Sequence, residues 1–167
     1  MRKIGLLSDT HGYLDPTVFD HFADCDELWH AGDIGNSKLV AQLTEFKPLR
    51  AVYGNIDGEP LKWELPETVR MTVEGVDILM IHIAGAFGRY TPALRSWVAE
   101  KKPDILICGH SHICKIARDE KFGWIYLNPG ACGRHGFHQV RTVVRMTLDA
   151  GRIAGLEVIE LGKRASL

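Results

Sequence analysis

Apolar and polar positions alternate in blocks along the first hundred residues, as strands and helices do in an α/β domain. Short apolar runs of the kind that form buried strands occupy three segments: Lys3–Ser8, Glu27–Ala31 and Leu49–Tyr53. Asp15 is placed to cap a helix that begins at Pro16, where a missing N–H does no harm. A second helix is expected from Asn36 or Ser37 to about Phe46.

The second half of the chain is richer in strand patterns. A tight turn joins two expected strands, Thr68–Val73 and Val76–Ile81. Thr91 and Pro92 begin a helix that should reach about Lys101. Later apolar runs predict five more strands: Asp104–Cys108, Ile113–Arg118, Trp124–Leu127, Gln139–Leu148 and Arg152–Glu160. We therefore expect one α/β domain over residues 1–167, with two sheets packed face to face and helices outside.

Composition narrows the class of protein. With 46% hydrophobic and 25% charged residues, the chain has the composition of an ordinary soluble globular protein. A formal net charge of −1 argues against stable nucleic-acid binding and against attraction to an anionic membrane. No apolar run has the length of a membrane span or a signal-peptide core, so we expect a cytoplasmic protein. The four cysteines form no C-x-x-C pair and should be free thiols, and a homo-oligomer is compatible with these features.

Five polar signatures stand where apolar runs end, and each contains a residue type that binds metal ions: Asp9-Thr10-His11, Gly32-Asp33, Gly54-Asn55, His82 and Gly109-His110-Ser111-His112. Alone, each is typical of a turn, a helix cap or a surface position. Ligands of open α/β sheets bind beyond the carboxyl ends of the strands, and parallel strands gather those ends at one edge. The joint placement of the five signatures therefore favours a metal site.

The residue types indicate which metals and which substrates to expect. Carboxylate, imidazole and amide ligands without thiolates suit Mn²⁺, Fe, Co²⁺, Ni²⁺ or Zn²⁺. Two such ions beside two aspartates leave a charge of about +2, which attracts a phosphate and lowers the pKa of a bound water.

In order and spacing, these signatures resemble the calcineurin-like metallophosphoesterase superfamily, in particular its small bacterial and archaeal phosphodiesterase branch. The resemblance extends over nearly the whole chain and implies a four-layer αββα sandwich of two mixed β-sheets flanked by helices. It implies that the first of two metal ions is bound by Asp9, His11 and His112. It implies that the second is bound by Asn55, His82 and His110, with Asp33 bridging both.

The resemblance also implies an activity: hydrolysis of a small-molecule phosphate ester, most simply a phosphodiester, with Mn²⁺ the first choice of metal. A hydroxide that bridges the two metals would attack phosphorus, in line with the leaving alkoxide and without a covalent phospho-enzyme. Asn55 and Asp57 are the candidate catalytic residues.

Two positions depart from the pattern of that family. Many relatives carry a proton-donating histidine after the asparagine, where this chain has Ile56, so good leaving groups should be favoured. Asp57 is the candidate substitute donor, and its alternative role is to form a turn or to support the site. The second departure is Ile83, which replaces the usual glycine after His82 and could shift the ring of His82.

Two rival functions remain open on the sequence. The retromer scaffold subunit resembles this family and serves as a binding surface, and Ile56 keeps that possibility for this chain. A nuclease is disfavoured by the absence of a basic stripe.

Several further residues have a structural and a functional interpretation. We expect His30 to support the site from a packed position. Arg134, His135 and His138 belong to a loop that is either solvated or close to substrate. Asn128-Pro129-Gly130 should form a turn that shapes the site without binding metal, and the four tryptophans should pack in the core.

Overall fold

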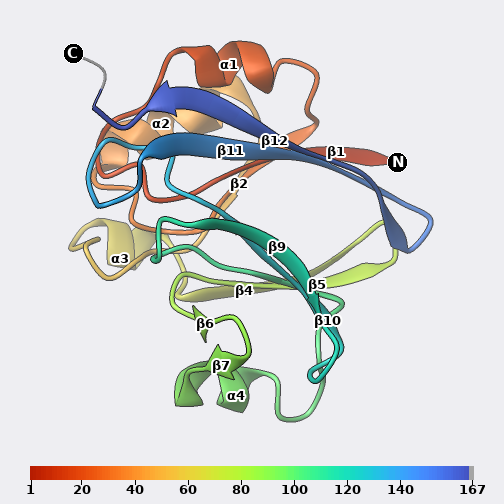
Figure 1. Ribbon diagram of the computed structural model, residues 1–167. Coiled ribbons are helices and arrows are strands. Elements are labelled where there is room, and N and C mark those ends of the chain that lie inside the picture. The colour runs from red at the N-terminus through yellow and green to blue at the C-terminus, as the bar shows by residue number, and fades with distance from the viewer. Residues whose placement is uncertain (166–167) are drawn as a thin grey trace.

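The computed structural model describes residues 1–165 and contains two mixed five-stranded sheets packed face to face (Figure 1). The first sheet has the order β12-β11-β1-β2-β3. Its strands are β1 (Arg2–Leu7), β2 (Glu27–His30), β3 (Leu49–Ala51), β11 (Val140–Asp149) and β12 (Arg152–Lys163). Strands β1, β2 and β3 are parallel, whereas β11 is antiparallel to both of its neighbours, β1 and β12.

The second sheet has the order β4-β5-β8-β10-β9. Its strands are β4 (Thr68–Val73), β5 (Val76–Ile81), β8 (Ile105–Ile107), β9 (Cys114–Asp119) and β10 (Trp124–Pro129). The three central strands β5, β8 and β10 are parallel, and the two edge strands are antiparallel to them. A small separate hairpin consists of β6 (Gly85–Ala86) and β7 (Arg89–Tyr90).

Helices cover the outer face of each sheet, so the four-layer αββα architecture is confirmed (Figure 1). Helices α1 (Thr17–His21) and α2 (Ser37–Phe46) pack on the first sheet through apolar residues such as Val18 and Leu43. Helix α4 (Pro92–Trp97) packs on the second sheet through Leu94. A third apolar cluster fills the space between the sheets, where Ile4 and Trp29 meet Ile78.

The register of the parallel strands brings their carboxyl ends together. Leu7 pairs with His30 and His30 with Ala51, so β1, β2 and β3 end side by side. In the second sheet, Met80, one residue before the end of β5, pairs with Ile107 at the end of β8. The loops that follow these five strands therefore begin at one end of the sandwich.

Several predicted boundaries were wrong. Helix α1 begins one residue later than expected, although Asp15 Oδ1 still accepts the Thr17 N–H at 3.0 Å. Helix α4 stops at Trp97 instead of Lys101, because the Lys101 carbonyl accepts from Arg70 and its ammonium pairs with Asp77 on the neighbouring hairpin. Strand β3 ends at Ala51, before the expected Tyr53. Helix α3 (Leu61–Glu64) and the β6–β7 hairpin are additional elements that the apolar pattern did not predict.

The predicted turn at Asn128-Pro129-Gly130 is in part strand, because Asn128 and Pro129 pair with Lys115 and Cys114 and close β10. Only Gly130 leaves the strand, with φ of +76°. Of the tryptophans, Trp29 and Trp124 are buried as expected, but Trp63 and Trp97 are exposed.

All four cysteines are free, as expected. Within residues 1–165, no helix has both the length and the apolar character needed to cross a membrane.

Candidate metal-binding site

The seven residues that the sequence predicts as metal ligands meet at the shared end of the two sheets. Five of them have an unusual backbone: Asp9, His11, Asp33, His110 and His112 all have positive φ, between 47° and 69°. In the described part of the chain only two other non-glycine residues have positive φ, and both lie in hairpin turns. Such conformations cost free energy and cluster at functional sites.

Two glycines let the loops approach closely. A Cβ on Gly109 would overlap the Ser8 hydroxyl and the Asp9 carboxylate, and a Cβ on Gly54 would overlap the backbone and the carboxylate of Asp33. The G-H-x-H and G-N loops therefore need glycine so that their next residues reach the two aspartates.

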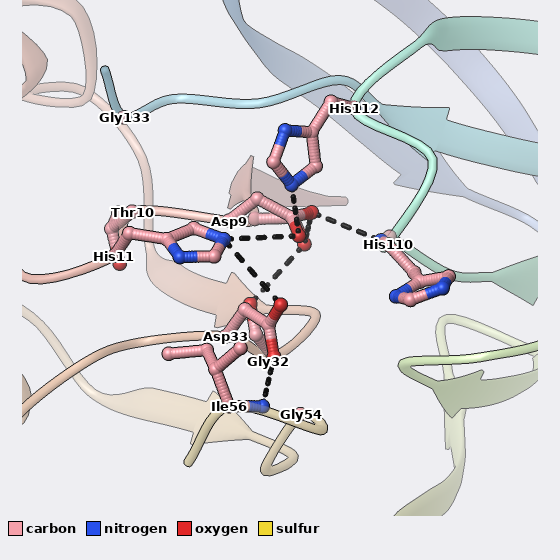
Figure 2. Close-up of polar contacts among 12 residues, drawn as sticks. Asp9, Thr10, His11, Gly32, Asp33, Gly54, Ile56, His110, His112 and Gly133 are labelled. Carbon is pink, nitrogen blue, oxygen red and sulfur yellow. Dashed lines mark hydrogen bonds and ion pairs between the residues drawn. The ribbon is translucent and has the colours of Figure 1, made fainter. Parts of the chain in front are cut away.

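The first group of side chains comprises Asp9, His11, Asp33 and His112, whose potential ligand atoms lie within 4.8 Å of one another. His112 Nε2 is 3.1 Å from Asp9 Oδ1, and His11 Nε2 is 3.4 Å from Asp33 Oδ2. Figure 2 shows the rings of His11 and His112 directed toward these carboxylates from two different loops. Asp9 and Asp33 are buried and His11 and His112 are partly buried, so the whole group is shielded from solvent.

The second group comprises Asp33, His82 and His110, also within 4.8 Å, and Asn55 lies among them. Asn55 Oδ1 is 3.1 Å from His82 Nε2 and 2.9 Å from His110 Nδ1. His82 Nε2 is 3.2 Å from Asp33 Oδ1. Asp33 therefore belongs to both groups, with Oδ2 toward the first and Oδ1 toward the second.

Two buried atoms of the first group have no hydrogen-bond partner among the described residues: Asp9 Oδ1 and His11 Nε2. The other oxygen of Asp9 is well satisfied, because Oδ2 accepts from Ser8 Oγ at 2.7 Å and from the His110 N–H at 3.1 Å. A buried carboxylate oxygen without a donor is costly. The unpartnered atoms face the interior of the first group, where a cation would satisfy them.

The second group also contains acceptor atoms without a donor, because of the tautomer of His82. Its Nδ1 lies 2.7 Å from the Ala31 carbonyl and can only donate to it. The neutral ring then directs a lone pair from Nε2 at the oxygens of Asn55 and Asp33, which are also acceptors. Converging acceptors need a proton or a metal ion between them, so the donor set fits a cation.

The pKa values respond to the same crowding. Burial alone would lower the pKa of His82, but its hydrogen bond to Asp33 and the charge of Asp9 raise it above its ordinary value. Burial alone would raise the pKa of Asp33. The contacts with His82 and with the Ile56 N–H outweigh burial, so the pKa is lowered. Burial lowers the pKa of His11, and this effect outweighs the charges of Asp33 and Asp9, which raise the pKa.

Residues 2–151 match the profile of the calcineurin-like phosphoesterase superfamily domain. The chain belongs to this superfamily. A probable metallophosphoesterase of Methanothermobacter thermautotrophicus is 32% identical over 133 residues, which are 77% of this chain and 76% of that protein. The chain thus shares its superfamily with a probable metallophosphoesterase, and its Asp/His cluster has residue types that can hold a metal ion.

Two solved structures illustrate the range of proteins that share this superfamily fold. An archaeal phosphodiesterase superposes with a TM-score of 0.74 at 20% identity, over 95% of this chain and 99% of that one. Vps29 of Entamoeba histolytica, solved in complex with Zn²⁺, gives a TM-score of 0.70 at 16% identity, over 98% and 99%. At these identities the similarity demonstrates the fold alone.

Buried polar residues behind the candidate ligands form hydrogen bonds with the loops that carry those ligands. His30 is fully buried and burial lowers its pKa to about 4, so the ring is neutral. Its Nδ1 accepts the Gly32 N–H at 3.1 Å and its Nε2 lies 3.0 Å from Thr10 Oγ1. His30 therefore connects the loops that carry Asp9 and Asp33, in the supporting position expected for it.

Asp57 is also buried, and both of its carboxylate oxygens are engaged. Oδ2 accepts the N–H groups of Gly54 and Ile34 at 2.8 and 3.1 Å, and Oδ1 accepts that of Gly35 at 2.9 Å. These contacts join the G-N loop to the G-D loop and favour the supporting role over proton donation.

Asn128 and Ser8 are further supporting residues. Asn128 Nδ2 donates to the Gly109 carbonyl at 2.8 Å and to Ser111 Oγ at 3.1 Å, which holds the G-H-x-H loop. Ser8 was not among the predicted site residues, because a serine that ends a buried strand has no sequence signal of its own. The only hint is its place directly before Asp9.

The loop that contains Arg134, His135 and His138 lies against the first group. The His135 ring is 4.8 Å from that of His11, and the His138 ring is 5.2 Å from that of His112, between centroids. The exposed Arg134 guanidinium stacks 4.0 Å over Tyr13. The loop therefore borders the site, while Arg134 and His135 remain exposed to solvent.

Proposed function

We propose that this protein is a dinuclear-metal phosphoesterase that hydrolyses phosphodiesters, with Mn²⁺ as the first choice of metal. The observation that carries the proposal is the position of Asp33, whose two oxygens face two separate groups of histidines. One shared carboxylate between two ligand sets is what a pair of neighbouring ions needs. Membership of a phosphoesterase superfamily supplies the reaction class.

In this proposal Asp9, His11 and His112 hold one ion, and Asp33 contributes one oxygen to each of the two. The second ion is held by Asn55, His82 and His110. When bound, the two cations would supply a water molecule of lowered pKa and offset the charge of the phosphoryl oxygens.

The chain's own residues prepare the ligand atoms for this task. Ser8 and the His110 N–H occupy Asp9 Oδ2 and leave Oδ1 directed inward. The Ile56 N–H fixes Asp33 Oδ1 at 3.0 Å. The Ala31 carbonyl sets the tautomer of His82 so that Nε2 is a ligand. Preorganised ligands of this kind lose little free energy when an ion or a transition state is bound.

Proton donation to the leaving group is the weak step. Ile56 has no donor, and the oxygens of Asp57 are occupied by backbone N–H groups. We propose that esters of acidic alcohols, which leave without a proton, are hydrolysed best. The fold similarity to an archaeal phosphodiesterase supports diesters over monoesters.

A protein-binding scaffold is the second candidate function. It is supported by the similarity of the fold to Vps29 and by the missing donor at Ile56. Because a Vps29 has been solved with Zn²⁺, binding of metal does not separate the two candidates. Turnover does.

The test measures metal content and turnover on the same sample. Protein stripped with a chelator and reloaded with Mn²⁺ should hold two ions per chain and hydrolyse bis(p-nitrophenyl) phosphate. Asp33→Ala should lose both properties, whereas Asp20→Ala, at an exposed position on α1, should keep them. Two bound ions without turnover on any diester or monoester would favour the scaffold, and full activity in Asp33→Ala would refute the proposed site.

A further inference from the structure

A cavity of about 330 Å³ opens beside the second group of candidate ligands. Asn55 and His82 line it, together with residues that include Tyr53, Ile83, Thr91 and Ala93. A cavity of about 150 Å³ lined by aliphatic and aromatic side chains already accommodates benzene. This one therefore has room for a ring-sized organic group.

The chemistry of the wall selects an apolar group. Ile83, Tyr53 and Ala93 line the cavity, and Ile83 departs from the glycine that the superfamily resemblance leads us to expect at this position. Two exposed charged residues, Lys62 and Glu67, also border it. Their opposite charges give the cavity no net preference for an anionic or a cationic ligand.

The cavity lies to one side of the site. Its lining includes Asn55 and His82 from the second group, but none of Asp9, His11 and His112 from the first. In an in-line displacement the leaving group departs opposite the attacking water. A space beside only one of the two groups is therefore suited to a substituent that points sideways from phosphorus and stays on it.

We infer that this cavity binds the organic substituent that remains on phosphorus during hydrolysis, and that this substituent is apolar and ring-sized. The inference rests on the proposed function and deepens it. The attacking water forms a P–O bond while the P–O bond to the leaving alcohol breaks, the water gives its proton to solvent, and a monoester product keeps the retained group. Monoesters have no such group, so the cavity also accounts for a preference for diesters.

The experiment compares two diesters that share one leaving group. Phenyl p-nitrophenyl phosphate and methyl p-nitrophenyl phosphate both release p-nitrophenolate and differ only in the retained substituent. For the Mn²⁺-loaded protein, kcat/KM for the phenyl ester should exceed that for the methyl ester by about tenfold or more, after correction for their intrinsic reactivities.

Three variants locate the source of that preference. Ala93→Phe fills the cavity from α4, far from any candidate ligand in sequence, and Ile83→Ser makes its wall polar. Both should bring the ratio of the two kcat/KM values close to one. Ile113→Ser is the matched control, because Ile113 follows His112 as Ile83 follows His82 but is exposed and does not line the cavity. It should keep the preference.

A binding measurement separates this inference from the proposed function. Phenylphosphonate and methylphosphonate carry an unreactive P–C bond, and calorimetry on the Mn²⁺-loaded protein should show tighter binding of phenylphosphonate, by about tenfold, with the preference lost in Ala93→Phe.

The outcomes are distinct. Turnover of both diesters with a ratio unchanged by Ala93→Phe would overturn the cavity assignment and leave the phosphodiesterase intact. Selective binding of phenylphosphonate without any turnover would support the cavity and refute the hydrolase. Failure of both phosphonates to bind, together with no turnover of either diester, would refute both proposals.

Discussion

Two buried aspartates in neighbouring loops, Asp33 and Asp57, have opposite surroundings. Every contact of Asp57 is a backbone N–H group, three in all, shared between its two oxygens. Asp33 accepts one backbone N–H, and its remaining contacts are imidazole nitrogens of two different groups. Both are almost fully buried, so burial alone does not distinguish them.

The comparison shows how the same side chain serves a scaffold or a site. A carboxylate whose lone pairs are filled by backbone N–H groups stabilises the loops and has little left for a ligand. A carboxylate that faces histidines keeps its affinity for cations. The free-energy cost of burying its charge is offset only when a cation is bound. We expect the two aspartates to respond differently to metal and to substitution.

The largest expected effect is stabilisation by metal. At a free Mn²⁺ concentration about a hundredfold above the dissociation constant, each occupied site adds about 2.7 kcal/mol to the free energy of unfolding, or about 5 kcal/mol for two sites. Asp33→Asn should lose nearly all of this gain, because both of the proposed ion sites use its carboxylate. Urea unfolding with and without Mn²⁺ measures it, and an undiminished gain in the variant would contradict a shared ligand.

Asp57→Ala should produce the reverse pattern. Three buried N–H groups lose their acceptor, so the metal-free protein should be less stable by about 3 kcal/mol. Urea unfolding without metal measures this loss, and Asp33→Asn under the same conditions should change stability by less than about 1 kcal/mol. Equal losses in the two variants would remove the distinction between scaffold and site.

A smaller effect concerns pH and His30. Burial holds the pKa of His30 at about 4 in the folded protein, below its ordinary value. Between pH 6.5 and 4 the unfolded chain binds a proton at this residue and the folded chain does not. Stability from this residue is therefore complete above pH 6.5 and falls with decreasing pH, by about 1 kcal/mol per unit.

His30→Asn is the matched variant for this effect, because its amide oxygen can accept the Gly32 N–H without titrating. Its stability should fall less steeply than that of the unsubstituted protein over the same pH range, as measured by urea unfolding. Parallel curves for the two proteins would show that His30 is not held neutral by the fold.

Much of the site could be predicted from the sequence because its signals are local. An apolar run that ends at a metal-binding residue marks a strand end, and parallel strands bring such ends together. This logic alone placed Asp9, Asp33 and His82 at one edge, and the structure brings them together there.

What escaped prediction depends on contacts between distant segments. Helix α4 ends early because Arg70 donates a hydrogen bond to the Lys101 carbonyl and Asp77 forms an ion pair with the Lys101 ammonium. Arg70 and Lys101 are 31 residues apart in the chain. Asp57 has the sequence signal of a turn former, and only the fold reveals that it accepts N–H groups from the preceding loop. The cavity beside Asn55 likewise needs α3 and α4 to be placed, and helix α3 was not predicted.

The smallest expected effect tests how Asp9 is oriented. Ser8→Ala removes the hydroxyl that donates to Asp9 Oδ2 at 2.7 Å, while the His110 N–H keeps its own hydrogen bond to the same oxygen. Affinity for Mn²⁺ should fall by about tenfold, as is usual when a residue that orients a metal ligand is removed. Calorimetric titration measures this, with Thr44→Ala on the exposed side of α2 as the control. Unchanged affinity in Ser8→Ala would mean that the N–H of His110 alone suffices to direct Oδ1 into the site.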